Sequence, residues 1–301
     1  MKTKLLLIAT VGAAFAGSAG ATVINLTTAG TSGVLNQGIF VQGSIQPAGT
    51  GVFGTFLKYQ PGGNQTAVQG YNTDARNQGN PKTQYDEQNA APHTHSLGLN
   101  EIPNPLCDTA LMPGCAAGEH YRQFDLDINQ NNNDPLLSLD RVVIYQRLAG
   151  DLFGGQATHG QQLGATTLFT GAGDNLVYDS GAANRVDLNW AIVKGGSGKS
   201  DMYLYVPDKL FKTGFVYLYS EFGLFATASG SGKKKAQAAE VPCSPGPVAC
   251  GGPQDDDSGF EEWGVRAFVD PASHVPEPGS IVLFGSSVLA IALWGRKRFA
   301  R

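Results

Sequence analysis

The sequence predicts an all-β fold, a single antiparallel β-sandwich of the jelly-roll kind, and three observations lead to this prediction. Charged residues make up only 15% of the chain, and glycine accounts for 40 of its 301 residues. Short stretches rich in Val, Ile, Phe, Tyr and Thr are separated by clusters of Gly and Asn, which is typical of strands joined by turns. Between the two end segments, no run of good helix formers is long enough for an organising helix.

The first 21 residues have the organisation of a secretory signal peptide. Lys2 and Lys4 precede an apolar core over 5–15, and small residues stand at Ala19 and Ala21. A charged start, a short apolar core and an A-x-A pattern are the three parts of a cleavable export signal. We expect cleavage after Ala21, because the apolar core is too short for a permanent anchor.

The chain is therefore expected to have three parts: a signal peptide over 1–21, an exported body over 22–273 and a terminal segment over 274–301. The two end segments contain six of the 21 basic residues and one of the 25 acidic residues. The body keeps 15 basic and 24 acidic residues, a net charge of −9. Such an acidic body argues against nucleic acid or anionic lipid as a partner, and it favours divalent cations.

Strands are expected where apolar, β-branched and aromatic residues gather. YRQFDLDIN, over 121–129, alternates cleanly, so its three apolar residues face one side and its three acidic or amide residues face the other. FVYLYSEFGLF, over 215–225, is the most apolar stretch, and we expect it to be a central strand. The other expected strands are 38–45, 51–59, 137–147, 165–170, 175–178, 185–194, 202–206 and 259–269.

The remaining stretches are expected to be loops. QPAGT, over 46–50, is a hairpin-like break between the first two strands. Residues 60–80 are polar and rich in Gly, Asn and Gln, so they are expected to form a long loop or a ragged sheet edge. Residues 82–118 contain several prolines and two cysteines and are expected to be irregular surface. Residues 230–258 contain KKK, several prolines and DDD, so they are expected to interrupt the body before its last strand.

The chain has four cysteines, Cys107, Cys115, Cys243 and Cys250. An exported protein folds in an oxidising compartment, where an even number of cysteines favours disulfides. The simplest pairing is local, 107 with 115 and 243 with 250, although four cysteines allow three connectivities. Neither spacing is C-x-x-C, so a structural zinc site is not expected.

A D-x-D-x-N run, formed by Asp125, Asp127 and Asn129, is the candidate metal site. Alternation on a strand places these three side chains on one face, and calcium is often bound by Asp and Asn oxygens at alternating positions. The run is not an EF-hand, because Gln130 and Leu136 stand where Gly and Glu are required. Calcium is therefore the candidate cofactor, and the alternative is a solvated strand face followed by a polar turn.

No catalytic constellation stands out, so we assign no catalytic residues and do not expect an enzyme. The chain has no G-x-S-x-G elbow. Glu261 and Glu262 are adjacent, so on a strand they point to opposite faces and cannot act as a pair. Trp190 and Trp263 are candidates for stacking on sugars, but core packing is the default for one Trp per strand.

The last 27 residues, VPEPGSIVLFGSSVLAIALWGRKRFAR, combine three features. An exposed Pro-Glu-Pro motif is followed by 14 apolar or small residues over 281–294 and then by a basic cluster. The motif is Pro276, Glu277 and Pro278, and the basic cluster includes Arg296, Lys297 and Arg298. The basic cluster is expected to stay in the cytoplasm, and the apolar run is shorter than the roughly 20 residues of a comfortable transmembrane helix.

This tail resembles the PEP-CTERM sorting signal of Gram-negative bacteria. The resemblance implies recognition by an integral-membrane exosortase and cleavage near the Pro-Glu-Pro motif. It also implies export across the inner membrane to the cell surface or the extracellular space, where proteins of this family are often linked to polysaccharide and biofilm. Exosortase and extracellular polysaccharide are therefore the expected partners.

The body is similar to uncharacterised β-rich domains of PEP-CTERM proteins, through FDLDINQ, PLLSLDRVVIYQ, VDLNW, GSGKSDMYLYVP, FVYLYSEFG and FEEWGV. That similarity names no ligand. The expected function is structural or adhesive in an extracellular matrix, with calcium as a candidate ligand. The alternatives are a secreted hydrolase that acts on polysaccharide and a surface protein permanently anchored by its tail.

Overall fold

The structure is a computed structural model whose described residues all lie in the first of two compact units, 1–266 and 267–301. The described residues are 21–43, 54–59, 67–74, 86–87, 93–130, 135–150, 175–193, 199–223, 241–242, 249–250 and 261–265. The terminal sorting segment, the expected strand over 165–170 and all of the expected signal peptide except Ala21 lie outside them. Within the described part of the chain, no helix has the length and apolar character needed to cross a membrane.

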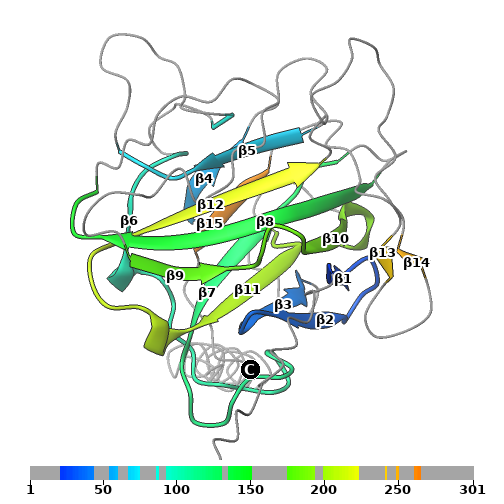
Figure 1. Ribbon diagram of the computed structural model, residues 1–301, viewed down its shortest axis with the longest axis horizontal. Coiled ribbons are helices and arrows are strands. Elements are labelled where there is room, and N and C mark those ends of the chain that lie inside the picture. The colour runs from blue at the N-terminus through cyan, green and yellow to red at the C-terminus, as the bar shows by residue number, and fades with distance from the viewer. Residues whose placement is uncertain are drawn as a thin grey trace, which may run out of the picture. The chain divides into compact units, whose positions relative to one another are not determined.

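Two large sheets make up the described fold (Figure 1). Sheet A has the order β1 (Val23–Asn25), β10 (Arg185–Asn189), β8 (Leu136–Arg147), β12 (Phe215–Gly223) and β5 (Ala67–Tyr71), with β9 (Asn175–Asp179) also paired to β8 and β6 (Leu97–Gly98) to β12. Sheet B has the order β2 (Ser32–Leu35), β3 (Gly38–Gln42), β11 (Met202–Pro207), β7 (Tyr121–Asp127), β15 (Glu262–Val265) and β4 (Gly54–Lys58).

Short elements complete the fold. A third, two-stranded sheet pairs β13 (Val241–Pro242) with β14 (Ala249–Cys250). Among the described residues, the 3₁₀ turns η2 (Leu99–Glu101), η4 (Trp190–Ile192) and η5 (Asp208–Leu210) follow β6, β10 and β11.

Sheets A and B share one hydrophobic core. Figure 1 shows β8 and β12 side by side in one layer, with β7, β11 and β15 in the layer behind. Sheet B contributes Phe40, Phe56, Phe124, Leu126, Leu204 and Trp263 to the core, and sheet A contributes Leu139, Ile144, Val186, Leu218 and Phe222. The described residues therefore confirm the prediction of a β-rich fold, and they form two large sheets around one core.

The strands with the strongest sequence patterns lie where expected. Phe124, Leu126 and Ile128 point into the core, as the alternation of β7 predicts. β12 pairs with β8 on one side and with β5 and β6 on the other, so it is the central strand that its apolar sequence predicts. Aromatic side chains on both faces of β12 are buried accordingly.

Two expectations about the sheets are wrong, and a third is decided between its alternatives. The sheets are not purely antiparallel, because β1 runs parallel to β10, with Val23 opposite Arg185. Of the two alternatives for 60–80, a long loop or a ragged sheet edge, β5 supports the second, since it pairs with β12 at the edge of sheet A despite its weak strand propensity. β3 and β4 are not a hairpin: β3 lies between β2 and β11, whereas β4 is an edge strand next to β15.

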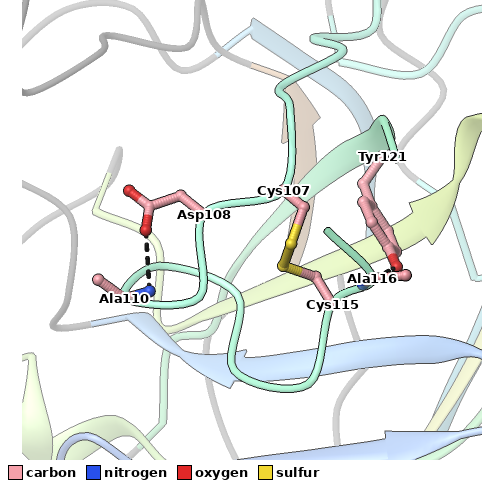
Figure 2. Close-up of a disulfide and its surroundings, with 6 residues drawn as sticks. All are labelled: Cys107, Asp108, Ala110, Cys115, Ala116 and Tyr121. Carbon is pink, nitrogen blue, oxygen red and sulfur yellow. Dashed lines mark hydrogen bonds between the residues drawn. A yellow bond between two sulfur atoms is a disulfide. The ribbon is translucent and has the colours of Figure 1, made fainter. Parts of the chain in front are cut away.

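The disulfide between Cys107 and Cys115 confirms one of the two expected pairings (Figure 2). The two Cα atoms are 5.7 Å apart, which is ordinary for a disulfide. Inside the loop, Asp108 Oδ1 accepts a hydrogen bond from the Ala110 N–H at 2.9 Å. The other expected pairing, Cys243 with Cys250, stays a prediction, because Cys243 lies outside the described residues.

The disulfide-closed loop covers part of the outer face of sheet B, so residues 82–118 are not merely irregular surface. Met112 packs with the outward-facing side chains of β3, β7 and β11, and both cysteines contact this second cluster. The members of the cluster are Ile39, Val41, Met112, Tyr121, Tyr203 and Tyr205. The Tyr121 hydroxyl accepts a hydrogen bond from the Ala116 N–H at 2.9 Å, which ties the end of the loop to β7.

Replacing Cys107 and Cys115 by serine is expected to lower the free energy of unfolding by about 2–3 kcal/mol, because the unfolded chain regains the entropy of an open loop. Urea denaturation of the double variant under oxidising conditions measures the loss. The wild-type and variant proteins are compared again after reduction of their disulfides, and the difference that then remains is the effect of the serine substitutions alone. An unchanged denaturation midpoint in the double variant would show that the loop contributes nothing to stability.

Candidate functional site

The candidate calcium ligands Asp125 and Asp127 lie on the outer face of β7, opposite to the core residues Phe124 and Leu126. The strand alternation is therefore as predicted. Both acids are nevertheless buried, with exposed fractions of 0% and 7%. The alternative prediction of a solvated strand face is wrong, because this part of the outer face is covered.

Asp125 is held by two neutral donors. The Gln123 side chain donates its Nε2–H to Oδ1 at 2.8 Å, and the Ser200 hydroxyl donates to Oδ2 at 3.0 Å. Gln123 and Asp125 belong to the same strand, whereas Ser200 lies just before β11, so the Ser200 bond connects two neighbouring strands of sheet B. The carboxyl group of Asp125 thus has a structural role at the β7–β11 boundary.

Asn129 lies beyond the end of β7. Its backbone N–H donates to Glu261 Oε2 at 3.1 Å, and the Gln130 side chain donates to Glu261 Oε1 at 2.9 Å. Among the residues that the structure describes, no group of three or more His, Cys, Asp and Glu side chains has the arrangement of a metal site. A calcium site formed by Asp125, Asp127 and Asn129 stays a prediction.

A row of charged side chains crosses the outer face of sheet B. Glu262 of β15 lies opposite Asp127 of β7 on one side and opposite Lys58 of β4 on the other. Lys58 Nζ forms an ion pair with Glu262 Oε1, and the Thr55 hydroxyl donates to Glu262 Oε2 at 3.2 Å. Glu262 is therefore neutralised within the row.

Asp201 extends this row on the other side of Asp127. The Asp201 N–H donates to the Leu126 carbonyl at 2.7 Å. Asp201 therefore lies one residue beyond the point where Met202 of β11 pairs with Leu126 of β7. Burial raises the pKa of the Asp201 carboxyl well above its ordinary value, the Ile128 N–H opposes this rise, and the neighbouring Asp127 adds to it. The sequence analysis missed Asp201, because its only signal was a single Asp before a strand.

Two acids of sheet A have similar properties. Removal from water raises the pKa of the Asp140 carboxyl well above its ordinary value, although the residue as a whole keeps some exposed surface. Burial also raises the pKa of Asp187, and the hydrogen bond from Arg185 Nε at 2.8 Å counteracts part of this rise. The folded protein thus holds several carboxyl groups that bind protons more tightly than they do in water.

The stability of the protein is expected to fall as the pH rises above the ordinary Asp pKa of about 3.9 in metal-free buffer. The pKa values of Asp140, Asp187 and Asp201 are raised in the folded state, whereas Asp titrates near 3.9 in an unfolded chain. Above about pH 4 the folded state therefore binds more protons, and stability is lost as the pH rises through the folded pKa values. Thermal melts across this range measure the slope, and a melting temperature that increases with pH would contradict the prediction.

The described residues form an open cleft of about 510 Å³ beside η2. It is lined by Gly98, Leu99, Asn100, Glu101, Arg122, Thr213, Gly214 and Phe215. The Arg122 guanidinium is held by Asp208 at 2.6 Å and by two backbone carbonyls at 2.9–3.0 Å. Among these lining residues Glu101 is the single acid, so the cleft does not offer the pair of carboxyl groups that glycoside hydrolysis requires.

The two tryptophans considered for sugar stacking lie in or against the core. Trp263 is fully buried, which confirms the default of core packing. Trp190 is partly buried and packs against the same core. Sugar stacking on Trp263 is therefore ruled out in the folded protein.

The fold and the acid-lined face define a β-rich protein of two sheets with a disulfide-closed loop over one of them. Comparison with protein-family models, with curated proteins and with solved structures finds no match for this chain. What the protein does must therefore be inferred from its own residues.

Proposed function

We propose that this protein is exported, sorted by an exosortase and retained as a structural or adhesive protein at the cell surface or in an extracellular matrix. The observation that carries the proposal is the order of the tail: Pro276-Glu277-Pro278, the apolar run over 281–294 and the basic cluster from Arg296. The signal-peptide pattern over 1–21 supports it independently. The disulfide between Cys107 and Cys115 suits a protein that folds in an oxidising compartment.

The proposal also includes the fold of the exported body. The two sheets share one core, which supports a closed β-sandwich of the jelly-roll kind between a cleaved signal peptide and a short transmembrane segment. A closed, stably packed body suits a structural or adhesive role. Its net charge of −9 over 22–273 favours partners such as extracellular polysaccharide bridged by divalent cations over nucleic acid.

The tail performs the sorting by simple physical chemistry. The apolar run enters the bilayer, and the basic cluster stays on the cytoplasmic side because its transfer across the membrane is costly. The Pro-Glu-Pro motif is then held at the outer surface, since prolines disfavour continuation of the helix. Cleavage beside the motif separates the exported body from its membrane segment.

Mass spectrometry of the protein recovered from its native host tests the proposal. We expect a mature chain that starts at Thr22 and ends near Pro276–Pro278, recovered from the cell surface or the surrounding matrix. A surface protein that still ends in GRKRFAR would replace sorting by permanent anchoring. Full-length protein in the cytosol with free thiols would refute export altogether.

A further inference from the structure

The open cleft of about 510 Å³ beside η2 has walls from both large sheets. β6, η2 and the start of β12 belong to sheet A or follow it directly, and Arg122 belongs to β7 of sheet B. Gly98 lies opposite Phe215, and the Leu99 N–H donates to the Gly214 carbonyl at 3.1 Å. Backbone pairing therefore sets the shape of the cleft. Its volume lies within the range of small-molecule binding sites, about 300–1,000 Å³.

Two glycines shape the walls of the cleft. Gly214 has a φ of 102°, and a Cβ atom there would lie 2.2 Å from the Arg147 carbonyl oxygen, so only glycine fits. A Cβ atom at Gly98 would lie 2.7 Å from Asn100 Oδ1 and 2.8 Å from Glu101 Oε1. The missing side chain at Gly98 therefore lets these two polar side chains of η2 approach the backbone of β6.

The cleft contains hydrogen-bonding groups that the protein itself does not use. Arg122 donates from Nε to Asp208 and from Nη1 to two backbone carbonyls, so Nη2 has no partner among the described residues. The side chains of Asn100 and Thr213 are exposed, and within the described part of the chain neither makes a hydrogen bond. Glu101 uses Oε1 to accept a backbone N–H at 2.7 Å. Donors and acceptors for a ligand thus line one cleft.

The other properties of the cleft favour an uncharged ligand. Leu99 and Phe215 are partly exposed and give the lining an apolar part. Arg122 is the single cation among the lining residues, and Asp208 balances its charge, while Glu101 adds a negative charge. An acidic ligand would therefore be repelled, and the net charge of −9 over 22–273 adds to this repulsion. Apolar surface beside donors and acceptors suits a neutral polyol.

We propose that this cleft binds a neutral sugar unit of a polysaccharide. The C–H face of a pyranose ring packs against Leu99 and Phe215. The sugar hydroxyls, which both donate and accept hydrogen bonds, bond to Asn100 and Thr213. Because Glu101 is the single acid among the lining residues, the sugar is held and not hydrolysed. The inference deepens the adhesive part of the proposed function and rests on it, since it names what the exported body holds.

An array of neutral oligosaccharides built from glucose, mannose and galactose, with alginate fragments as acidic probes, tests the proposal on the purified full-length protein. We expect binding to at least one neutral series and none to alginate. Asn100→Ala and Thr213→Ala each remove one hydrogen-bonding group and are expected to weaken binding by about 3- to 10-fold. Gly98→Ala displaces the neighbouring side chains of η2 without removing a polar group, and it is expected to weaken binding similarly.

The Asn104→Ala protein is the matched control, because Asn104 is an exposed residue just beyond η2 that does not line the cleft. It is expected to bind as the wild type does. A wild-type protein that binds no neutral oligosaccharide, or alginate alone, would overturn the proposal. Unweakened binding in Asn100→Ala, Thr213→Ala and Gly98→Ala would overturn it by placing the sugar elsewhere. Neither result would affect export or sorting, which are measured on the chain ends.

Discussion

The Trp263→Ala protein is expected to have a free energy of unfolding about 3–5 kcal/mol lower than that of the wild type. Trp263 is fully buried in the core that the two sheets share. Removal of the indole ring leaves a cavity that the surrounding strands fill only in part. The total stability of a domain is about 5–15 kcal/mol, so this single change removes a large share of it. Urea denaturation followed by circular dichroism measures the loss.

A chain of hydrogen bonds between the sheets adds to this effect. Trp263 Nε1 donates to the Ser220 hydroxyl oxygen at 2.9 Å, and Ser220 is bonded to the Tyr59 hydroxyl at 2.7 Å. Tyr59 donates its single hydroxyl proton to the Gly70 carbonyl at 3.0 Å, so Ser220 must be the donor to Tyr59. Burial raises the pKa of Tyr59 well above its ordinary value, which keeps that proton in place.

Two further variants separate packing from hydrogen bonding. Trp263→Phe retains an aromatic ring but loses the N–H donor, and its cost is expected to be about 1–2 kcal/mol. Trp190→Ala removes a tryptophan that is only partly buried, so it is expected to be less destabilising than Trp263→Ala. Equal losses for the two alanine variants would show that Trp263 has no special place in the core.

The parts of the fold that could be predicted from the sequence are those that local pattern determines. The alternation in β7 correctly placed Phe124 and Leu126 inside and Asp125 and Asp127 outside. The apolar run of β12 correctly indicated a central strand. The short spacing between Cys107 and Cys115 correctly favoured a local disulfide.

The pairing of strands could not be predicted in the same way. β5 is stabilised by β12, which lies far along the chain, and its own sequence AVQGY shows no alternation. The β2–β3 hairpin turns at Asn36 and Gln37, which have φ values of 47° and 75°. Asn commonly adopts such a conformation but Gln rarely does, so the turn lacks the usual Asn-Gly signal.

The pair of buried acids formed by Asp127 and Asp201 shows the same limit. Asp127 was found because it belongs to a visible alternating run. Asp201 was missed because only the register between β7 and β11 brings it beside Asp127. The burial of both acids also depends on what covers the outer face of sheet B, which a local pattern does not encode.

Replacing Pro276 and Pro278 together by alanine is expected to abolish processing of the tail, the largest functional effect that we predict. Alanines allow the helix of the apolar run to extend back through the motif, whereas prolines keep the motif extended. The cleavage site is then no longer presented at the membrane surface. Mass spectrometry is expected to find the uncleaved chain, with GRKRFAR intact, in the membrane fraction. The melting temperature of the body is expected not to change, because the motif lies outside the unit formed by 1–266.

The Pro271→Ala protein is the matched control, because it removes a nearby proline and leaves the motif itself intact. It is expected to be processed normally. Changing Arg296, Lys297 and Arg298 to glutamine tests the other end of the signal, since each basic residue opposes entry into the bilayer by about 2.5–3.5 kcal/mol at its centre. Without these positive charges, the end of the tail is expected to be held less firmly at the cytoplasmic surface, and processing is expected to decrease. If the motif and basic-cluster variants were both processed normally, the tail would not be a sorting signal, and its apolar run would have to be explained as a plain anchor.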